Sequence, residues 1–112
     1  MKMYKIGIIG LGYVGLPLAI EFGKHFYVSA FDVDKSRINQ LKNKFDKNLD
    51  ISAKEMIKSK KLSFTNNIFN LSECNFIIIT VPTPINKKNQ PDLTFLKKVL
   101  NFVSKILKKK YM

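Results

Sequence analysis

Cysteine and histidine are almost absent from this sequence, which contains only Cys74 and His25. A lone cysteine cannot form an internal disulfide, so we expect a reducing compartment. The sequence contains no cluster with metal-ligand spacing, and no histidine stands near Cys74 to activate it. We therefore predict no metal site and no catalytic residue, and we interpret Cys74 as a small buried side chain. His25 is expected at a helix end, in a solvated or capping role.

Long apolar runs are also missing. The N-terminal apolar run is short and interrupted by glycine, unlike a signal peptide. No stretch is long enough to cross a bilayer. With 112 residues the chain is expected to form one domain, and we predict a soluble, cytoplasmic protein with no membrane partner.

Acidic side chains are scarce: the sequence contains 8 acidic and 20 basic residues, and its formal net charge is +12. Among the basic residues only Arg37 is an arginine. The lysines are scattered over expected helix faces, and no RNA-binding or helix-turn-helix pattern accompanies them. We therefore predict no specific nucleic-acid partner. A binder driven by the lysines is a third-ranked alternative, which binding that survives moderate salt would support.

The glycines that are present are concentrated in Gly10-Leu11-Gly12-Tyr13-Val14-Gly15, between an apolar run and a helix-like run. Gly10 would allow a tight turn out of the strand. Gly12, without a Cβ, would let backbone lie against a pyrophosphate, and Gly15 would let the helix pack closely. Free N–H groups of the first helical turn would then face the phosphates. This arrangement predicts a dinucleotide site.

Asp32 ends the next apolar run and indicates which dinucleotide binds. Its carboxylate could accept both ribose hydroxyls of the adenosine half, but it would repel a 2′-phosphate. At ~4 Å that repulsion is about 1 kcal/mol in water and about 4 kcal/mol at an effective dielectric near 20. Asp32 therefore favours NAD over NADP, although an acid here could simply belong to a strand-end turn. Asp34 is expected to cap the following helix.

Strand-like and helix-like patterns alternate along the whole chain. We expect strands at 4–9, 27–32, 62–65 and 76–81, helices at 13–25, 35–45 and 93–110, a short helix from Ser52 to about Lys60, and a helical turn within 67–74. This alternation predicts an α/β fold with a Rossmann-like parallel sheet, flanked by helices and in strand order 3-2-1-4. With about four strands the fold would be incomplete, since the full fold has six.

Two further features could belong to the cofactor site. The loop 80–85 follows the fourth strand, beside the expected crevice, and its Thr83 could contact the cofactor; its prolines could equally well just end the strand. Arg37 could stack on adenine or reach the ribose, or it could be a solvated helix residue.

These landmarks resemble a known family. Lys5–Ala19, with Gly-Tyr-Val-Gly inside it, looks like the opening of the nucleotide-sugar 6-dehydrogenases, the UDP-glucose/GDP-mannose dehydrogenase family. Residues 31–38 and Val81-Pro82-Thr83-Pro84 match its next two landmarks. The run 90–94 is similar to members that act on UDP-N-acetylhexosamines.

The resemblance implies a truncated N-terminal NAD-binding domain over residues 1–112, without the sugar-binding and catalytic domain. Complete members oxidise a sugar C6 alcohol to a carboxylate through a cysteine thioester, for polysaccharide synthesis. The family's sugar-binding domain and catalytic cysteine would lie beyond residue 112, and Cys74 does not match that cysteine. The predicted cofactor-binding residues are Gly10, Gly12, Tyr13, Val14, Gly15, Asp32, Arg37 and Thr83.

Two functional hypotheses follow. In the first, the chain is the NAD-binding part of such a dehydrogenase, inactive alone, with a UDP-sugar as partner only of a longer parent protein. In the second, it is a non-enzymatic remnant or interaction module that self-associates through the uncovered edge of its fourth strand, 76–81. NAD affinity distinguishes the two.

Overall fold

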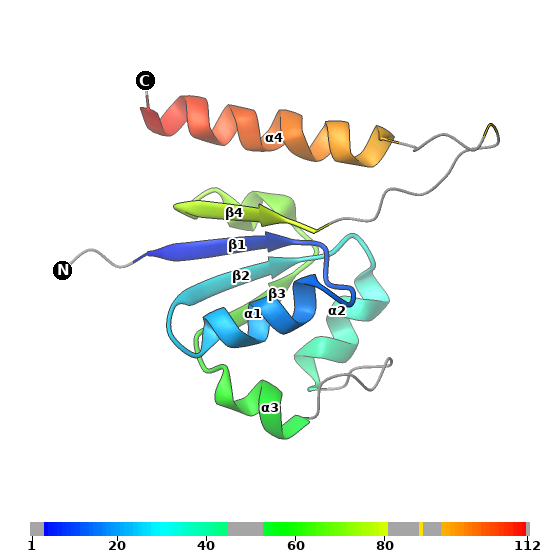
Figure 1. Ribbon diagram of the computed structural model, residues 1–112, viewed down its shortest axis with the longest axis vertical. Helices are drawn as coiled ribbons and strands as arrows, with labels where there is room; N and C mark the ends of the chain where they lie inside the picture. The colour runs from blue at the N-terminus through cyan, green and yellow to red at the C-terminus, as the bar shows by residue number, and fades with distance from the viewer. Residues whose placement is uncertain (1–3, 45–52, 81–87, 89–92, 112) are drawn as a thin grey trace. The chain divides into compact units, whose positions relative to one another are not determined.

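The computed structural model describes residues 4–44, 53–80, 88 and 93–111. The chain divides into two compact units, Met1–Thr80 and Val81–Met112. The first unit contains an α/β sheet with its helices, and the second contains one long helix (Figure 1). The elements of the first unit are β1 (Lys5–Ile9), α1 (Gly15–Gly23), β2 (Tyr27–Phe31), α2 (Lys35–Lys42), α3 (Ala53–Lys58), β3 (Leu62–Thr65), the 3₁₀ helix η1 (Ile68–Leu71) and β4 (Phe76–Ile79). The second unit contains α4 (Thr94–Tyr111).

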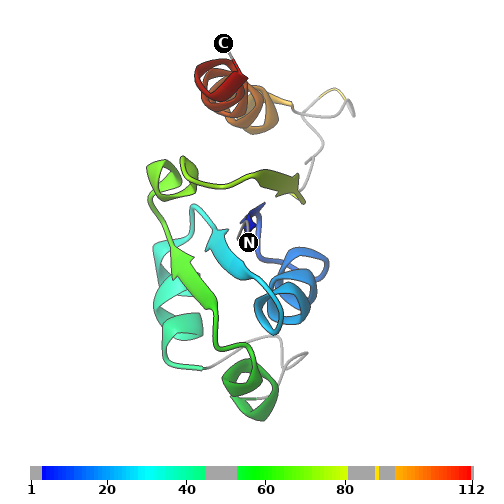
Figure 2. The same cartoon turned by 90° about the vertical axis from the view of Figure 1, so that its left-hand side faces the viewer.

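The four described strands form one parallel sheet in the order β3-β2-β1-β4, which confirms the predicted topology. The central strand β1 pairs Gly7 with Ser29 on one side and with Ile77 on the other. The turned view in Figure 2 shows the strands of the first unit in this spatial order, with β4 at one edge of the sheet and β3 at the other. The connections move across the sheet in one direction from β1 to β3 and then return to place β4 on the other side of β1. The carboxyl ends of β1 and β4 therefore meet where an open α/β sheet places its ligands.

One face of the sheet carries the main hydrophobic core. Alternate residues of each strand face it, since side chains of a strand point to opposite sides in turn. The cluster also includes residues of α1 and α2, so both helices pack on this face. Its buried members are Ile6, Ile8, Leu11, Leu16, Ala19, Ile20, Val28, Ala30, Ile38, Leu41, Met56 and Phe64.

The opposite face is covered at β1 by the segment around η1. A Cβ added at Gly7 would lie 3.0 Å from Leu71 Cδ2 and 3.1 Å from Cys74 Sγ, so this segment sits directly on the strand backbone. Cys74 is 2% exposed, which confirms its interpretation as a small buried side chain. His25 follows α1 and is exposed, as expected.

Several predicted bounds were too wide. Helix 13–25 is observed as Gly15–Gly23, because residues 10–14 form the turn out of β1. Helix 35–45 ends at Lys42, and Lys44 adopts a left-handed φ of 62° that no helix can continue. The strand expected at 76–81 is observed over Phe76–Ile79, although the Thr80 N–H still donates to the Ile9 carbonyl at 2.8 Å. Phe45 and Ser52, also assigned to helices, lie outside the described residues.

The helix predicted at 93–110 is observed as α4, over Thr94–Tyr111. Its first turn is closed by a hydrogen bond from the Lys97 N–H to the Leu93 carbonyl, at 2.8 Å. Within the described part of the chain, no helix combines the length and apolar character that crossing a membrane requires.

Candidate functional site

The glycine turn between β1 and α1 begins at Gly10, whose φ is 100°. L side chains rarely adopt this backbone conformation, so glycine is needed here. The Gly10 N–H donates to the Phe31 carbonyl at 2.8 Å, which continues the β1–β2 ladder for one more bond. The turn therefore starts at the carboxyl end of the two central strands.

Gly12 and Gly15 have opposite surroundings. A Cβ at Gly15 would overlap the Gly10 carbonyl oxygen and lie 2.5 Å from Thr80 Oγ1, so the start of α1 can approach the turn only because Gly15 has no side chain. Around Gly12, which is exposed, no atom of the described residues beyond its two chain neighbours lies within 4 Å of an added Cβ. The space beside Gly12 is open, as the approach of a cofactor diphosphate to the backbone requires.

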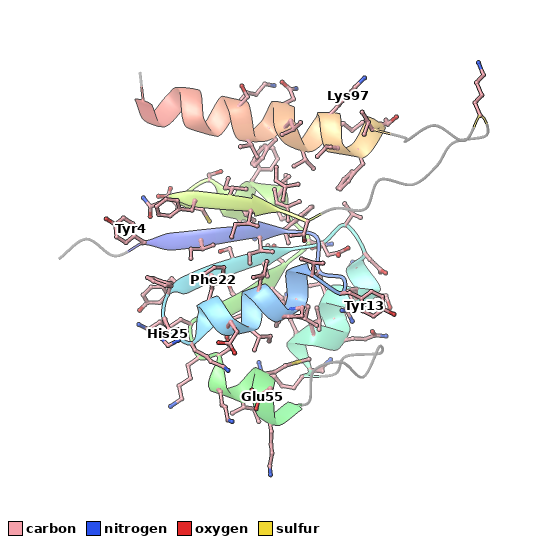
Figure 3. All side chains as sticks on the ribbon, in the orientation of Figure 1. Tyr4, Tyr13, Phe22, His25, Glu55 and Lys97 are labelled. Carbon is pink, nitrogen blue, oxygen red and sulfur yellow. The ribbon has the colours of Figure 1, made fainter. Side chains whose placement is uncertain are left out.

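The N-terminus of α1 is available to an anion. Val14 is the N-cap residue, and no side chain caps the helix there. The first N–H groups of a helix have no intrahelical partner, and together with the helix dipole they form an anion-binding site. Tyr13 and Val14 are exposed, and Figure 3 shows Tyr13 projecting outward beside α1. The residues present at this turn therefore fit a dinucleotide diphosphate.

Asp32 lies directly after β2 and turns its carboxylate toward the glycine turn. Oδ2 accepts the Leu11 N–H at 2.9 Å, and Oδ1 accepts the Asp34 N–H at 2.9 Å. A carboxylate oxygen has two lone pairs, so each keeps one for a ribose hydroxyl. Asp34 caps α2 as expected, because its Oδ1 accepts the Arg37 N–H at 3.2 Å.

Arg37 is buried, with only 5% of its surface exposed. Its Nε and Nη2 donate to the Leu11 carbonyl oxygen at 3.0 and 2.8 Å. The alternative that Arg37 is a solvated helix residue is therefore wrong. Its predicted contact with the adenosine half of the cofactor stays a prediction.

Thr80 belongs to the same site and was not among the predicted residues. Its hydroxyl lies 2.7 Å from the Gly10 carbonyl oxygen and 3.3 Å from that of Ile9. A hydroxyl donates one hydrogen, and the shorter contact assigns it to Gly10. The signal for this residue was available: in order 3-2-1-4, a threonine that ends the fourth strand lies beside the end of the first.

The remaining sequence-based assignments concern other parts of the chain. Thr83 and the rest of loop 81–87 lie outside the described residues, so its predicted cofactor contact is untested. Within the described ranges, no group of three or more His, Cys, Asp or Glu side chains could hold a metal ion.

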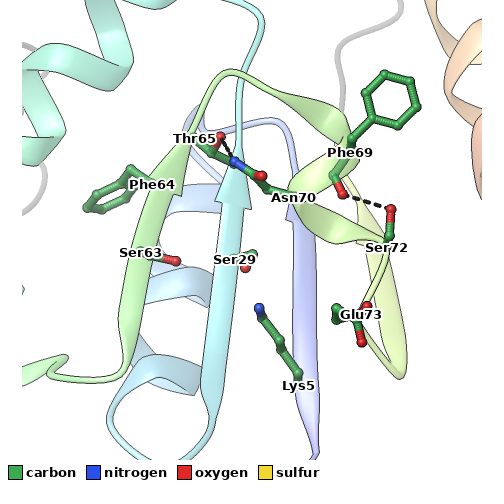
Figure 4. A pocket seen from close by; sticks show the side chains of 9 residues that line it. All are labelled: Lys5, Ser29, Ser63, Phe64, Thr65, Phe69, Asn70, Ser72 and Glu73. Atoms are coloured by element: carbon green, nitrogen blue, oxygen red, sulfur yellow. Dashed lines mark hydrogen bonds between the residues drawn. The ribbon is translucent and has the colours of Figure 1, made fainter.

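A hollow of about 440 Å³ opens on another part of the first unit, shown in Figure 4. None of the turn residues line it. Its walls are mostly polar side chains from the strands and from the segment around η1: Lys5, Ser29, Ser63, Phe64, Thr65, Phe69, Asn70, Ser72 and Glu73. It is distinct from the glycine turn.

Comparison of the chain with known proteins identifies its family. Residues 4–112 match the model of the UDP-glucose/GDP-mannose dehydrogenase family, NAD binding domain. UDP-N-acetyl-D-glucosamine 6-dehydrogenase of Pseudomonas aeruginosa is 49% identical over 109 residues, which cover 97% of this chain and 26% of that protein. The protein of the same name from Salmonella typhi is 56% identical over 103 residues, covering 92% of this chain and 24% of that one.

A solved structure agrees with the sequence relatives. UDP-D-ManNAc dehydrogenase of Pyrococcus horikoshii superposes with a TM-score of 0.75 at 30% identity, over 91% of this chain and 25% of that chain. The chain thus spans about a quarter of the length of the relatives it matches. Its fold is the Rossmann-like dinucleotide-binding fold, and its cofactor is NAD. The chain belongs to the UDP-glucose/GDP-mannose dehydrogenase family, whose NAD-binding domain it matches over residues 4–112.

Proposed function

We propose that this chain is the cofactor-binding part of a nucleotide-sugar 6-dehydrogenase that oxidises the C6 alcohol of a UDP-N-acetylhexosamine to a carboxylate. The substrate class is supported by two relatives at 49% and 56% identity, both UDP-N-acetyl-D-glucosamine 6-dehydrogenases. The product would be a uronate for surface polysaccharide synthesis. We place this reaction in the cytoplasm, a reducing compartment that suits a chain with one buried thiol.

The observation that carries the proposal is the pairing of an open Gly12 with the Asp32 carboxylate held at the same turn. In our proposal the diphosphate lies against Gly12 and accepts hydrogen bonds from the N–H groups of Tyr13 and Val14. The adenosine ribose donates its two hydroxyls to Asp32. A 2′-phosphate on that ribose would face the carboxylate, so the site should select NAD over NADP.

Titration with NAD and NADP tests the cofactor site. We expect NAD to raise the melting temperature of the 112-residue chain, since a ligand at about 100 times its Kd adds about 2.7 kcal/mol. NADP should give little shift. Asp32→Asn keeps the shape of the side chain and one acceptor oxygen. It should weaken NAD binding and reduce the ratio of the affinity for NAD to the affinity for NADP. Equal affinity of the wild-type chain for NAD and NADP would contradict the role given to Asp32.

We further propose that these 112 residues do not turn over UDP-sugars alone, because the relatives are about four times as long. The sugar site and the reactive cysteine would belong to the remaining length. Incubation with UDP-N-acetylglucosamine and NAD, followed at the NADH absorbance band, should show no turnover. Sustained NADH formation would overturn this part of the proposal.

Self-association is a second candidate function. Among the described strands β4 ends the sheet, pairing only with β1, and its Phe76 is 56% exposed. An uncovered strand edge offers unpaired N–H and C=O groups to another chain. Size-exclusion chromatography with light scattering should then detect dimers or larger species. A single monomeric peak at all concentrations would rule this candidate out.

A further inference from the structure

Two peptide units make up the start of the glycine turn, and side chains hold three of their four polar groups. In the Gly10–Leu11 unit, the carbonyl accepts the Thr80 hydroxyl at 2.7 Å and the N–H donates to Asp32 at 2.9 Å. In the Leu11–Gly12 unit, the carbonyl accepts both Arg37 contacts, at 3.0 and 2.8 Å. The Gly12 N–H is the fourth group, and it has no hydrogen-bond partner among the residues that the structure describes.

The geometry of a peptide unit connects these groups. No cis peptide is present among the described residues, so the Leu11 carbonyl and the Gly12 N–H point in opposite directions in one plane. Arg37 approaches the carbonyl from a buried position, at 5% exposure. The Gly12 N–H is therefore aimed away from Arg37. Gly12 itself is exposed, and the described residues leave open the space into which a Cβ at this position would point.

The charge of Arg37 also acts on the same peptide unit. A cation bonded to a carbonyl polarises the peptide and makes the N–H at its other end a stronger donor, because hydrogen bonds in a chain reinforce one another. Two donors from one rigid guanidinium also hold the carbonyl oxygen in place more firmly than a single donor would. The chain following Gly12 leads directly to the Tyr13 and Val14 N–H groups at the start of α1.

We propose that Arg37 is a positioning residue for the cofactor diphosphate. It holds and polarises the Leu11–Gly12 peptide so that the N–H groups from Gly12 to Val14 face the diphosphate, and it acts through the backbone instead of touching the adenosine. This inference rests on the NAD site described above. It replaces the expectation that Arg37 serves as an adenine- or ribose-contacting base.

Adenosine and ADP separate the two roles, since ADP adds only the diphosphate. We would titrate each ligand into the ¹⁵N-labelled chain and follow the amide signals of residues 12–14 together with Kd. In Arg37→Lys, which keeps the charge but not the paired donors, ADP affinity should fall about tenfold or more, equal to ~1.4 kcal/mol. Adenosine affinity should change less than about twofold, and the ADP-induced shift of the Gly12 amide should shrink.

Arg37→Gln removes the charge and should behave like Arg37→Lys or lose more ADP affinity. The matched control is Lys35→Gln, the same charge change at an exposed position on the same helix, which should leave both affinities unchanged. Equal losses for adenosine and ADP would overturn the inference and restore a direct contact with the adenosine. Unchanged ADP affinity in both Arg37 variants would overturn it as well. Failure of the wild-type chain to bind ADP or NAD would instead reject the cofactor site itself.

Discussion

The Thr80 hydroxyl donates a hydrogen bond to the Gly10 carbonyl oxygen at 2.7 Å, joining residues 70 positions apart. A Cβ at Gly15 would overlap the same oxygen. The end of β4, the end of β1 and the first residue of α1 therefore meet at one atom. Because that atom belongs to the turn at which we propose that the cofactor binds, substitutions around it should separate effects on folding from effects on binding.

Removal of the Thr80 hydroxyl should destabilise the first unit. Thr80→Val keeps the shape of the side chain but leaves a part-buried carbonyl without its donor, which costs about 1–3 kcal/mol. The melting temperature should fall by roughly 4–8 °C per kcal/mol for a domain of this size. Thr80→Ser retains the hydroxyl and should recover most of the loss. Equal melting temperatures for the Ser and Val variants would show that the bond contributes nothing.

Gly12→Ala and Gly15→Ala form a matched pair with opposite expected effects. At Gly15 the new methyl group has no room beside the Gly10 carbonyl and Thr80, so the melting temperature should drop by 10 °C or more, a cost of roughly 2 kcal/mol or above. At Gly12 the methyl group enters open space, so the fold should tolerate it. NAD should nevertheless bind Gly12→Ala at least about tenfold more weakly, because the methyl group occupies the side from which the diphosphate approaches.

Denaturation curves and NAD titrations of both glycine variants check this pair. A Gly12→Ala variant with normal NAD affinity would mean that the cofactor does not lie against this residue. A stable Gly15→Ala variant would mean that α1 can move away from the turn without cost.

Gly23 and Ser59 make a second close contact, between the end of α1 and the segment after α3. Ser59 Oγ donates to the buried Ile20 carbonyl at 2.7 Å, and a Cβ at Gly23 would overlap that same Oγ and lie 2.8 Å from Leu62 Cβ. Gly23→Ala should therefore destabilise the chain by more than about 1 kcal/mol. Ser59→Ala should cost about 1 kcal/mol through the lost bond.

The double variant tests whether these two residues interact directly. Since Ser59→Ala removes the overlapping oxygen, part of the Gly23→Ala loss should disappear in its presence, giving a coupling free energy in urea denaturation. Strict additivity of the two single losses would contradict the contact.

A surface network connects α1 to α3 and predicts an acid-sensitive contribution to stability. Lys24 lies 2.7 Å from Glu21 and 3.5 Å from Glu55, and Glu55 lies 3.1 Å from Lys58. The hydrogen bond from Lys58, followed by the charges of Lys58 and Lys24, lowers the pKa of Glu55 below its ordinary 4.5. The hydrogen bond to Glu21 in turn raises the pKa of Lys24 above 10.5.

The two shifts act at opposite ends of the pH scale. The contribution of Glu55 is complete above pH 4.5 and is lost as the pH falls through its lower folded value. The contribution of Lys24 is complete below pH 10.5 and is lost as the pH rises through its raised value. In Glu55→Gln, the difference in melting temperature from wild type should be greatest near neutral pH and should shrink below pH 4. A difference that stays constant from pH 7 to pH 3 would contradict this assignment.

Much of the fold could be predicted because its signals are local. The first two strand patterns, the glycine spacing and Asp32 at the end of the second strand lie within the first 32 residues, and the parallel order follows from the alternation of strands and helices along the chain. Helix ends were less accurate, since they depend on where one residue changes its backbone conformation, as Lys44 does with its φ of 62°. The sequence could identify Arg37 as unusual, but its surroundings could not be derived from neighbouring residues.

The sequence by itself determined the chemistry of the turn: which residues lack a Cβ, and where an acid follows the second strand. Backbone conformation and strand pairing depend on short-range sterics and periodic burial, which single residues encode directly. Only the tertiary structure decided that Arg37 is buried against the Leu11 carbonyl and that Thr80 holds Gly10. These contacts join residues 26 and 70 positions apart, and they exist only once the sheet has brought the strand ends together.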